Sequence, residues 1–231
     1  MKYTAEFNNI KELETFYCLF SNNMPGRAKD RSKIHRENVP FAKFAVLFSK
    51  CGWWDYPVRV EYSDKPDFRI SSAKGTIGIE VTEQKSKNYG HALALSERCD
   101  GFIESSDFRY DPNEKRLNGK QLGELVSKKE CNGPPSVGFM EENNWVLRSL
   151  DTAIGKVEQY KKYKQYEKYS QNVLLVFDVR PEFPQFTDIT KAMLTPIFGN
   201  CEVVRLFQHL VFIDSKCVHI DLTSQKMRIV S

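Results

Sequence analysis

A continuous run of apolar residues in the second half of the chain limits the possible folds more than any other feature. Residues 173–177 are Val-Leu-Leu-Val-Phe, with no polar residue among them. A strand that alternates apolar and polar residues can leave one face in water, but an uninterrupted run must be covered on both faces. The run therefore predicts a strand that is covered on both faces.

Apolar residues that recur every three or four positions predict the helices. The longest helix is expected directly before the apolar run, and the polar segment 26–37 is a connector or a short exposed helix. The predicted helices cover residues 8–21, 40–50, 91–104, 119–130, 142–169 and 187–197.

Alternation of apolar and polar residues predicts the strands, three of them before the insertion described below and four after the buried run. The predicted strands cover residues 57–62, 67–70, 76–82, 202–206, 209–213, 217–221 and 226–230. We expect a single domain over residues 1–231, because no linker divides the chain. Residues 88–143 are expected to be an insertion between core elements, and the last strands a β-rich C-terminal tail.

Two acidic residues lie on the adjacent predicted strands 67–70 and 76–82 in a pattern that suggests chemistry. Asp67 follows Pro66, and Glu80 comes thirteen residues later within an Ile-rich strand. A carboxylate inside an apolar strand is costly unless it is paired or bound to a metal. Because Mg²⁺ takes one or two protein carboxylates and keeps several waters, Asp67 and Glu80 are candidate metal ligands. The backbone carbonyl of Val81 is a candidate third ligand.

The pattern Pro66-Asp67, followed by Glu80-Val81-Thr82, resembles the PD-(D/E)xK nuclease superfamily, also called restriction-endonuclease-like. The resemblance covers residues 40–82 and 145–177. The resemblance implies an α/β fold with a core of order α-β-β-β-α-β, in which a mixed sheet is flanked by helices. It also implies a divalent-metal-dependent endonuclease that hydrolyses phosphodiester bonds with Mg²⁺ or Mn²⁺ as cofactor.

The chain departs from the superfamily pattern at one position, because Thr82 stands where the pattern has a lysine. A threonine hydroxyl cannot supply the positive charge of that lysine. Some branches of the superfamily place the lysine on another element, so Lys156 is the first candidate for the catalytic cation. Lys156 lies beside the apolar stripe of the long helix, and Lys85 is the second candidate because it follows Thr82 closely.

Other residues are candidates for additional roles at the site. Glu61 is a further metal ligand or a solvent-facing residue of an alternating strand, and Glu37 is another candidate metal ligand. Candidates for nucleic-acid binding are the basic residues of segment 27–36 and two residues of the long helix. The latter match a Q-x-x-x-Y element of RecB-like members of the superfamily. The candidate nucleic-acid-binding residues are Arg27, Lys29, Arg31, Lys33, Arg36, Gln159 and Tyr163.

Nucleic acid is the expected partner, with DNA favoured over RNA, and a homodimer or a regulatory protein partner is left open. The net charge of +4 permits a polyanionic partner without requiring one. No apolar stretch approaches the roughly 18 residues of a membrane span, and no signal sequence is recognised, so we expect a cytoplasmic protein with no membrane partner. A role in restriction, or in defence against phages and mobile elements, is an expectation from the resemblance.

Two alternatives to a constitutive DNA nuclease remain open from the sequence. The first is a catalytically inactive nuclease-like fold that binds nucleic acid or protein, which the missing motif lysine favours. The second is an RNase or effector nuclease that a partner activates, with the insertion 88–143 as its regulatory part.

Overall fold

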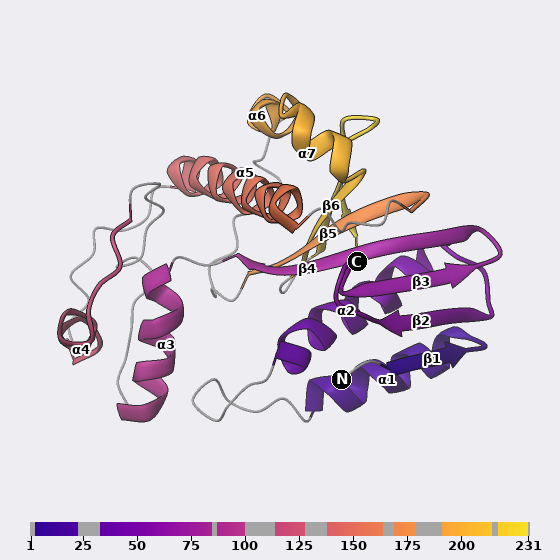
Figure 1. The fold of residues 1–231 in the computed structure, drawn as a ribbon, viewed down its shortest axis with the longest axis horizontal. Helices are drawn as coiled ribbons and strands as arrows, with labels where there is room; N and C mark the ends of the chain where they lie inside the picture. Colours follow the sequence, from indigo (N-terminus) through magenta and orange to yellow (C-terminus); the bar gives the residue numbers. More distant parts are fainter. Residues whose placement is uncertain are drawn as a thin grey trace.

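An eight-stranded mixed sheet forms the centre of the protein, with helices on both of its faces (Figure 1). The structure is a computed structural model. It describes residues 3–22, 33–84, 87–99, 114–127, 138–163, 169–178, 191–213 and 217–230. All statements below concern these residues.

The strands lie in the sheet in the order in which they occur in the sequence. Pairing is antiparallel from β1 to β4, parallel between β4, β5 and β6, and antiparallel again from β6 to β8. The strands are β1 Tyr3–Phe7, β2 Val58–Tyr62, β3 Phe68–Ser72, β4 Gly75–Gln84, β5 Gln171–Asp178, β6 His209–Ile213, β7 Cys217–Asp221 and β8 Lys226–Val230.

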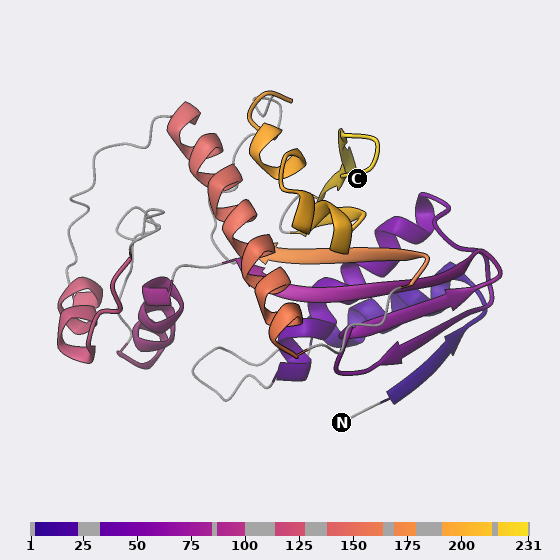
Figure 2. The same cartoon turned by 45° about the horizontal axis from the view of Figure 1, so that its top comes forward.

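Helices α1 and α2 cover one face of the sheet, and α5, α6 and α7 cover the other. Helices α3 and α4 pack on each other to one side of the sheet (Figure 2). No helix in the described ranges is long and apolar enough to cross a membrane. The helices are α1 Ile10–Asn22, α2 Lys33–Lys50, α3 Lys87–Cys99, α4 Gly119–Ser127, α5 Gly138–Tyr163, α6 Thr195–Phe198 and α7 Cys201–Leu206.

The apolar run 173–177 lies in strand β5, and both faces of this strand are buried, as predicted. Val173 and Leu175 belong to the core beneath α1 and α2. Leu174 and Val176 belong to the core beneath α5, α6 and α7. The prediction of an α/β protein with a mixed sheet between helical layers is confirmed.

Strand β4 has one apolar face and one face that carries polar residues, which positions the candidate site. Ile77, Ile79 and Val81 pack into the core beneath α2. Because side chains alternate along a strand, Glu80 and Gln84 point to the opposite face, where α5 lies. A carboxylate and an amide are thereby placed between the sheet and a helix.

Most predicted strands are present, but the one expected at 202–206 is wrong. Those residues form helix α7, although Val203 and Val204 favour a strand. The side chain of Asn200 accepts a hydrogen bond from the backbone N–H of Val203 at 3.0 Å, which caps the helix. Burial of Val203 against the sheet then outweighs local strand propensity. Strand β1 was not predicted at all.

Helix α2 begins earlier than the predicted start at residue 40. It runs from Lys33 through Pro40 to Lys50. A proline inside a helix removes one backbone hydrogen bond and usually marks a boundary. Here Pro40 is buried with the aromatic residues that follow it, and packing keeps the helix continuous. The first two turns of α2 therefore reach the sheet and bring polar residues to it.

Candidate active site

Asp67 and Glu80 lie close to each other at the point where β3 begins beside β4. Phe68 pairs with Ile79, so the residue before Phe68 and the residue after Ile79 are neighbours across the hairpin. Both carboxylates are buried, with 2% of Asp67 and 6% of Glu80 exposed. Phe68 anchors this corner, because its ring stacks on that of Phe41 in α2 at a centroid distance of 3.8 Å.

The carboxylate of Asp67 has two partners. Its Oδ2 accepts a hydrogen bond from the backbone N–H of Val81 at 2.9 Å, and its Oδ1 lies 3.4 Å from Lys33 Nζ. Burial, the largest cause, and the nearby carboxylates of Glu80 and Glu37 together raise the pKa of Asp67 to about 8, against the opposing effects of the Val81 N–H and Lys33. The site thus concentrates negative charge that its own cations do not fully offset.

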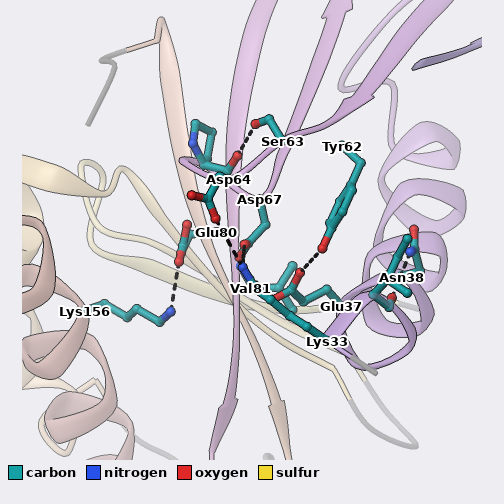
Figure 3. A network of polar contacts seen from close by, with 12 residues as sticks. Lys33, Glu37, Asn38, Tyr62, Ser63, Asp64, Asp67, Glu80, Val81 and Lys156 are labelled. Atoms are coloured by element: carbon teal, nitrogen blue, oxygen red, sulfur yellow. Dashed lines mark hydrogen bonds and ion pairs between the residues drawn. The ribbon is translucent and has the colours of Figure 1, made fainter. Parts of the chain in front are cut away.

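Lys33 and Glu37 extend the cluster from the first turns of α2 (Figure 3). Lys33 Nζ lies 3.6 Å from Glu37 and 3.5 Å from Asp64. Burial lowers the pKa of Lys33, but the surrounding carboxylates outweigh this effect and raise it. Glu37 accepts a hydrogen bond from the Tyr62 hydroxyl at 2.8 Å, and burial raises its pKa.

Glu80 is held from the other side of the sheet by Lys156 of α5. Lys156 Nζ lies 2.9 Å from Glu80 Oε1, and both side chains are largely buried. The second oxygen of Glu80, Oε2, is buried and has no hydrogen-bond partner within the described ranges. Figure 3 shows the two lysines approaching the carboxylates from opposite sides, Lys156 from α5 and Lys33 from α2. A buried carboxylate oxygen without a partner is costly, so it requires a cation or a proton donor.

Gln84 and Ser149 continue the polar line between β4 and α5. Gln84 is fully buried, and its Oε1 accepts a hydrogen bond from the Ser149 hydroxyl at 3.2 Å. Its amide nitrogen is buried without a partner among the described residues. Thr82 lies between Glu80 and Gln84 on β4 and is half-buried.

A cavity of about 200 Å³ opens on the α2 side of the site, next to Lys33. Its basic residues, Lys33 and Arg36, come from α2, and Val81 and Thr82 form part of its wall. Because Lys33 also contacts Asp67, the cavity adjoins the carboxylates of the site. Its lining is completed by Glu37, Glu83 and Phe177.

The structure separates Glu61 from the carboxylate cluster. Glu61 lies on β2 and faces Arg59 and Arg69, with N···O distances of 2.8 and 3.7 Å. Val81 contacts Asp67 through its backbone N–H, whereas the sequence analysis assigned its carbonyl to the metal. Glu37, by contrast, lies beside Asp67 and shares Lys33 with it.

The other candidate residues fall in different places. Lys33 and Arg36 reach the site, and Lys33 contacts carboxylates as well as lining the cavity. Gln159 is exposed on α5, and the side chain of Tyr163 at the end of that helix lies outside the described residues. Lys85, Arg27, Lys29 and Arg31 also lie outside them.

Three contacts that shape the site were not predicted from the sequence. They are the contact of Lys33 with Asp67, that of Tyr62 with Glu37, and that of Ser149 with Gln84. The first two depend on the early start of α2, which Pro40 concealed. The third had a partial signal, because Gln84 lies two residues beyond Thr82 on the same face of the strand.

The metal that the sequence analysis expected would have to be held by few protein ligands. Among the described residues, no three His, Cys, Asp or Glu side chains form a group that could hold a metal ion. Two carboxylates remain adequate for Mg²⁺ or Mn²⁺, since such ions keep several waters. The buried, unpartnered Oε2 of Glu80 and the raised pKa of Asp67 fit a divalent cation between them. Comparisons of the chain with family models, curated proteins and solved structures found no match.

Proposed function

We propose that the protein is a divalent-metal-dependent nuclease whose active site contains Asp67, Glu80 and Lys156. The observation that carries this proposal is the buried Glu80 carboxylate, which has Lys156 on one oxygen and no partner among the described residues on the other. When α3 and α4 of the insertion are left out, the order α2-β2-β3-β4-α5-β5 matches the α-β-β-β-α-β pattern of the PD-(D/E)xK superfamily. In that superfamily Asp67 and Glu80 would hold the metal, and Lys156 would replace the lysine absent at Thr82.

The geometry suggests a separate role for each side chain. Asp67 and Glu80 would hold a Mg²⁺ or Mn²⁺ ion, which when bound supplies positive charge against the phosphate and acidifies a water. Lys156, held against Glu80 in a largely buried position, would orient the attacking water and offset negative charge as it develops on the phosphate. Lys33 and Arg36 at the neighbouring cavity would position the scissile phosphate.

The substrate is proposed to be DNA, on the resemblance of the Pro66-Asp67 and Glu80-Val81 pattern alone. The described surface gives no feature that separates DNA from RNA. Roles in restriction or in defence against phages and mobile elements remain part of the same proposal.

A catalytically inactive nucleic-acid-binding module is the alternative that a specific observation favours. Each carboxylate already has a lysine partner, Lys33 for Asp67 and Lys156 for Glu80. Two such ion pairs could stabilise the fold without any chemistry. This alternative predicts nucleic-acid binding that needs neither a metal nor the carboxylates.

A cleavage assay separates the two functions. The wild type would be incubated with supercoiled plasmid, linear duplex, single-stranded DNA and RNA, in Mg²⁺, Mn²⁺ or EDTA. We expect metal-dependent cutting of at least one substrate and none in EDTA. Glu61→Gln is expected to stay within about threefold of the wild type, because Glu61 pairs with Arg59 and Arg69 away from the site.

Either of two results would contradict the proposal. One is cutting that persists unchanged in EDTA. The other is the absence of cutting on all four substrates while the protein binds one of them in EDTA, which would favour the inactive module.

A further inference from the structure

A second cavity, of about 490 Å³, lies at the other end of the sheet. Gln171, the first residue of β5, borders it, whereas Phe177 near the end of β5 borders the cavity next to Lys33. Gln171 and Phe177 are six residue steps apart along the strand, which is about 20 Å. The residues that matter in the second cavity are Trp53, His209, His219, Asp221, Lys226 and Arg228.

Two buried histidines and one arginine form a hydrogen-bonded chain in its wall. Arg228 Nε donates to His219 Nδ1 at 2.9 Å, and His219 Nε2 lies 3.1 Å from His209 Nδ1. An arginine only donates, so His219 Nδ1 carries no proton and its N–H is on Nε2. His219 then donates to His209, which must carry its own proton on Nε2.

Both imidazoles are neutral in this arrangement. Burial, the largest cause, together with His209 and Arg228 lowers the pKa of His219 to about 3. Burial also lowers the pKa of His209. The positive charge of the cavity therefore resides on Arg228 and its neighbour Lys226 rather than on the histidines.

Aromatic packing holds the histidine pair in place. The ring of Trp53 lies 4.8 Å from that of His209 and 5.1 Å from that of His219, measured between centroids. Phe48 of α2 packs against His219 from the core at 5.5 Å. Because His219 is fixed, the Nε of Arg228 is fixed as well, and the guanidinium is held at the rim of the cavity.

The charge at this rim is not balanced. Arg228 and Lys226 are exposed residues of β8, and no carboxylate of the described residues forms an ion pair with Arg228. The acidic residue of the cavity, Asp221, uses Oδ1 to accept hydrogen bonds from the backbone N–H groups of Thr223 and Ser224. A metal ion is disfavoured, since Arg228 already occupies the His219 nitrogen that would bind it.

We propose that this cavity binds a phosphorylated small molecule the size of a mononucleotide. The volume lies within the roughly 300 to 1,000 Å³ that is usual for small-molecule sites. The phosphate would contact Lys226 and the terminal nitrogens of Arg228, whose Nε is already engaged. The organic part would lie against Trp53 and Met227, which also line the cavity. The proposal does not depend on nuclease activity, because the two cavities share no residue.

Isothermal titration of the full chain tests this site. The probes are 5′-AMP, 5′-UMP, adenosine and a single-stranded oligonucleotide with a 5′ phosphate, all in EDTA. Arg228→Gln and Lys226→Gln remove the two cations, and Arg116→Gln, an exposed arginine elsewhere, is the matched control. Circular dichroism checks that each variant is folded.

We expect one of the two mononucleotides to bind saturably and at least about tenfold more tightly than adenosine. Arg228→Gln should weaken that binding about tenfold or more, Lys226→Gln less, and Arg116→Gln less than twofold. The proposal is overturned if neither mononucleotide binds, if only the oligonucleotide binds, or if Arg116→Gln weakens binding as much as Arg228→Gln. Loss of binding in Asp67→Asn but not in Arg228→Gln would also overturn it, because the ligand would then occupy the other cavity.

Discussion

Replacing either Glu80 or Lys156 by glutamine should reduce metal-dependent cleavage at least about 100-fold, and replacing both should reduce it little further. Lys156 Nζ lies 2.9 Å from Glu80 Oε1, so the two side chains form one unit. Residues that act as a unit show strongly non-additive losses. The cleavage rate of the double variant should therefore lie within about tenfold of the rate of the less active single variant.

Lys162→Gln is the matched control, because it removes an exposed lysine from the same helix, α5. Its cleavage rate should stay within about twofold of the wild type. Two results would show that Lys156 acts only through the general positive charge of the helix. One is a double variant whose loss of cleavage rate is the product of the two single losses, and the other is a Lys162→Gln variant that loses as much activity as Lys156→Gln.

Asp67→Asn should inactivate the enzyme and at the same time stabilise the metal-free protein at pH 8. Burial raises the pKa of Asp67 to about 8 from 3.8, so the folded state keeps a proton that the unfolded state releases between those values. Stability conferred by this group is full below pH 4 and is lost as the pH rises toward 8. Asparagine does not ionise, and its oxygen can still accept the N–H of Val81.

The difference in unfolding free energy between Asp67→Asn and the wild type should therefore grow from pH 5 to pH 8. Over this range it should shift in favour of the variant by on the order of 4 kcal/mol, since each pH unit between the two pKa values corresponds to about 1.4 kcal/mol. Urea unfolding in EDTA measures it. Glu61→Gln, whose carboxylate is paired outside the site, should show no such trend. A variant less stable than the wild type at every pH would mean that Asp67 serves only as the partner of Lys33.

The sequence was sufficient to predict the strands that carry the two carboxylates. The alternation of residue types over β2 and β4 and the apolar run of β5 are local patterns. They reflect whether one face or both faces of a strand are buried. Asp67 and Glu80 were recognisable because a turn and an Ile-rich strand place them on one hairpin. Lys156 was recognisable from its place beside the apolar stripe of α5.

Other parts of the site depend on contacts between distant segments. Lys33 and Glu37 reach Asp67 only because α2 continues through Pro40, and burial of that proline is a tertiary effect. Helix α7 forms where valines favour a strand, because Asn200 caps it and Val203 packs into the core. The histidine pair of the second cavity joins β6 to β7 and depends on an arginine of β8. None of these contacts leaves a periodic signal in the sequence.

Binding of Mn²⁺, followed by electron paramagnetic resonance, tests most directly whether Asp67 and Glu80 form a metal site. The titration would be run with and without a phosphorothioate duplex that resists cleavage, on the wild type, Asp67→Asn, Glu80→Gln and Glu61→Gln. We predict saturable binding to the wild type and to Glu61→Gln, weakened at least about tenfold in the other two. Binding that is absent from the wild type under both conditions, or unchanged in Asp67→Asn and Glu80→Gln, would contradict the assignment.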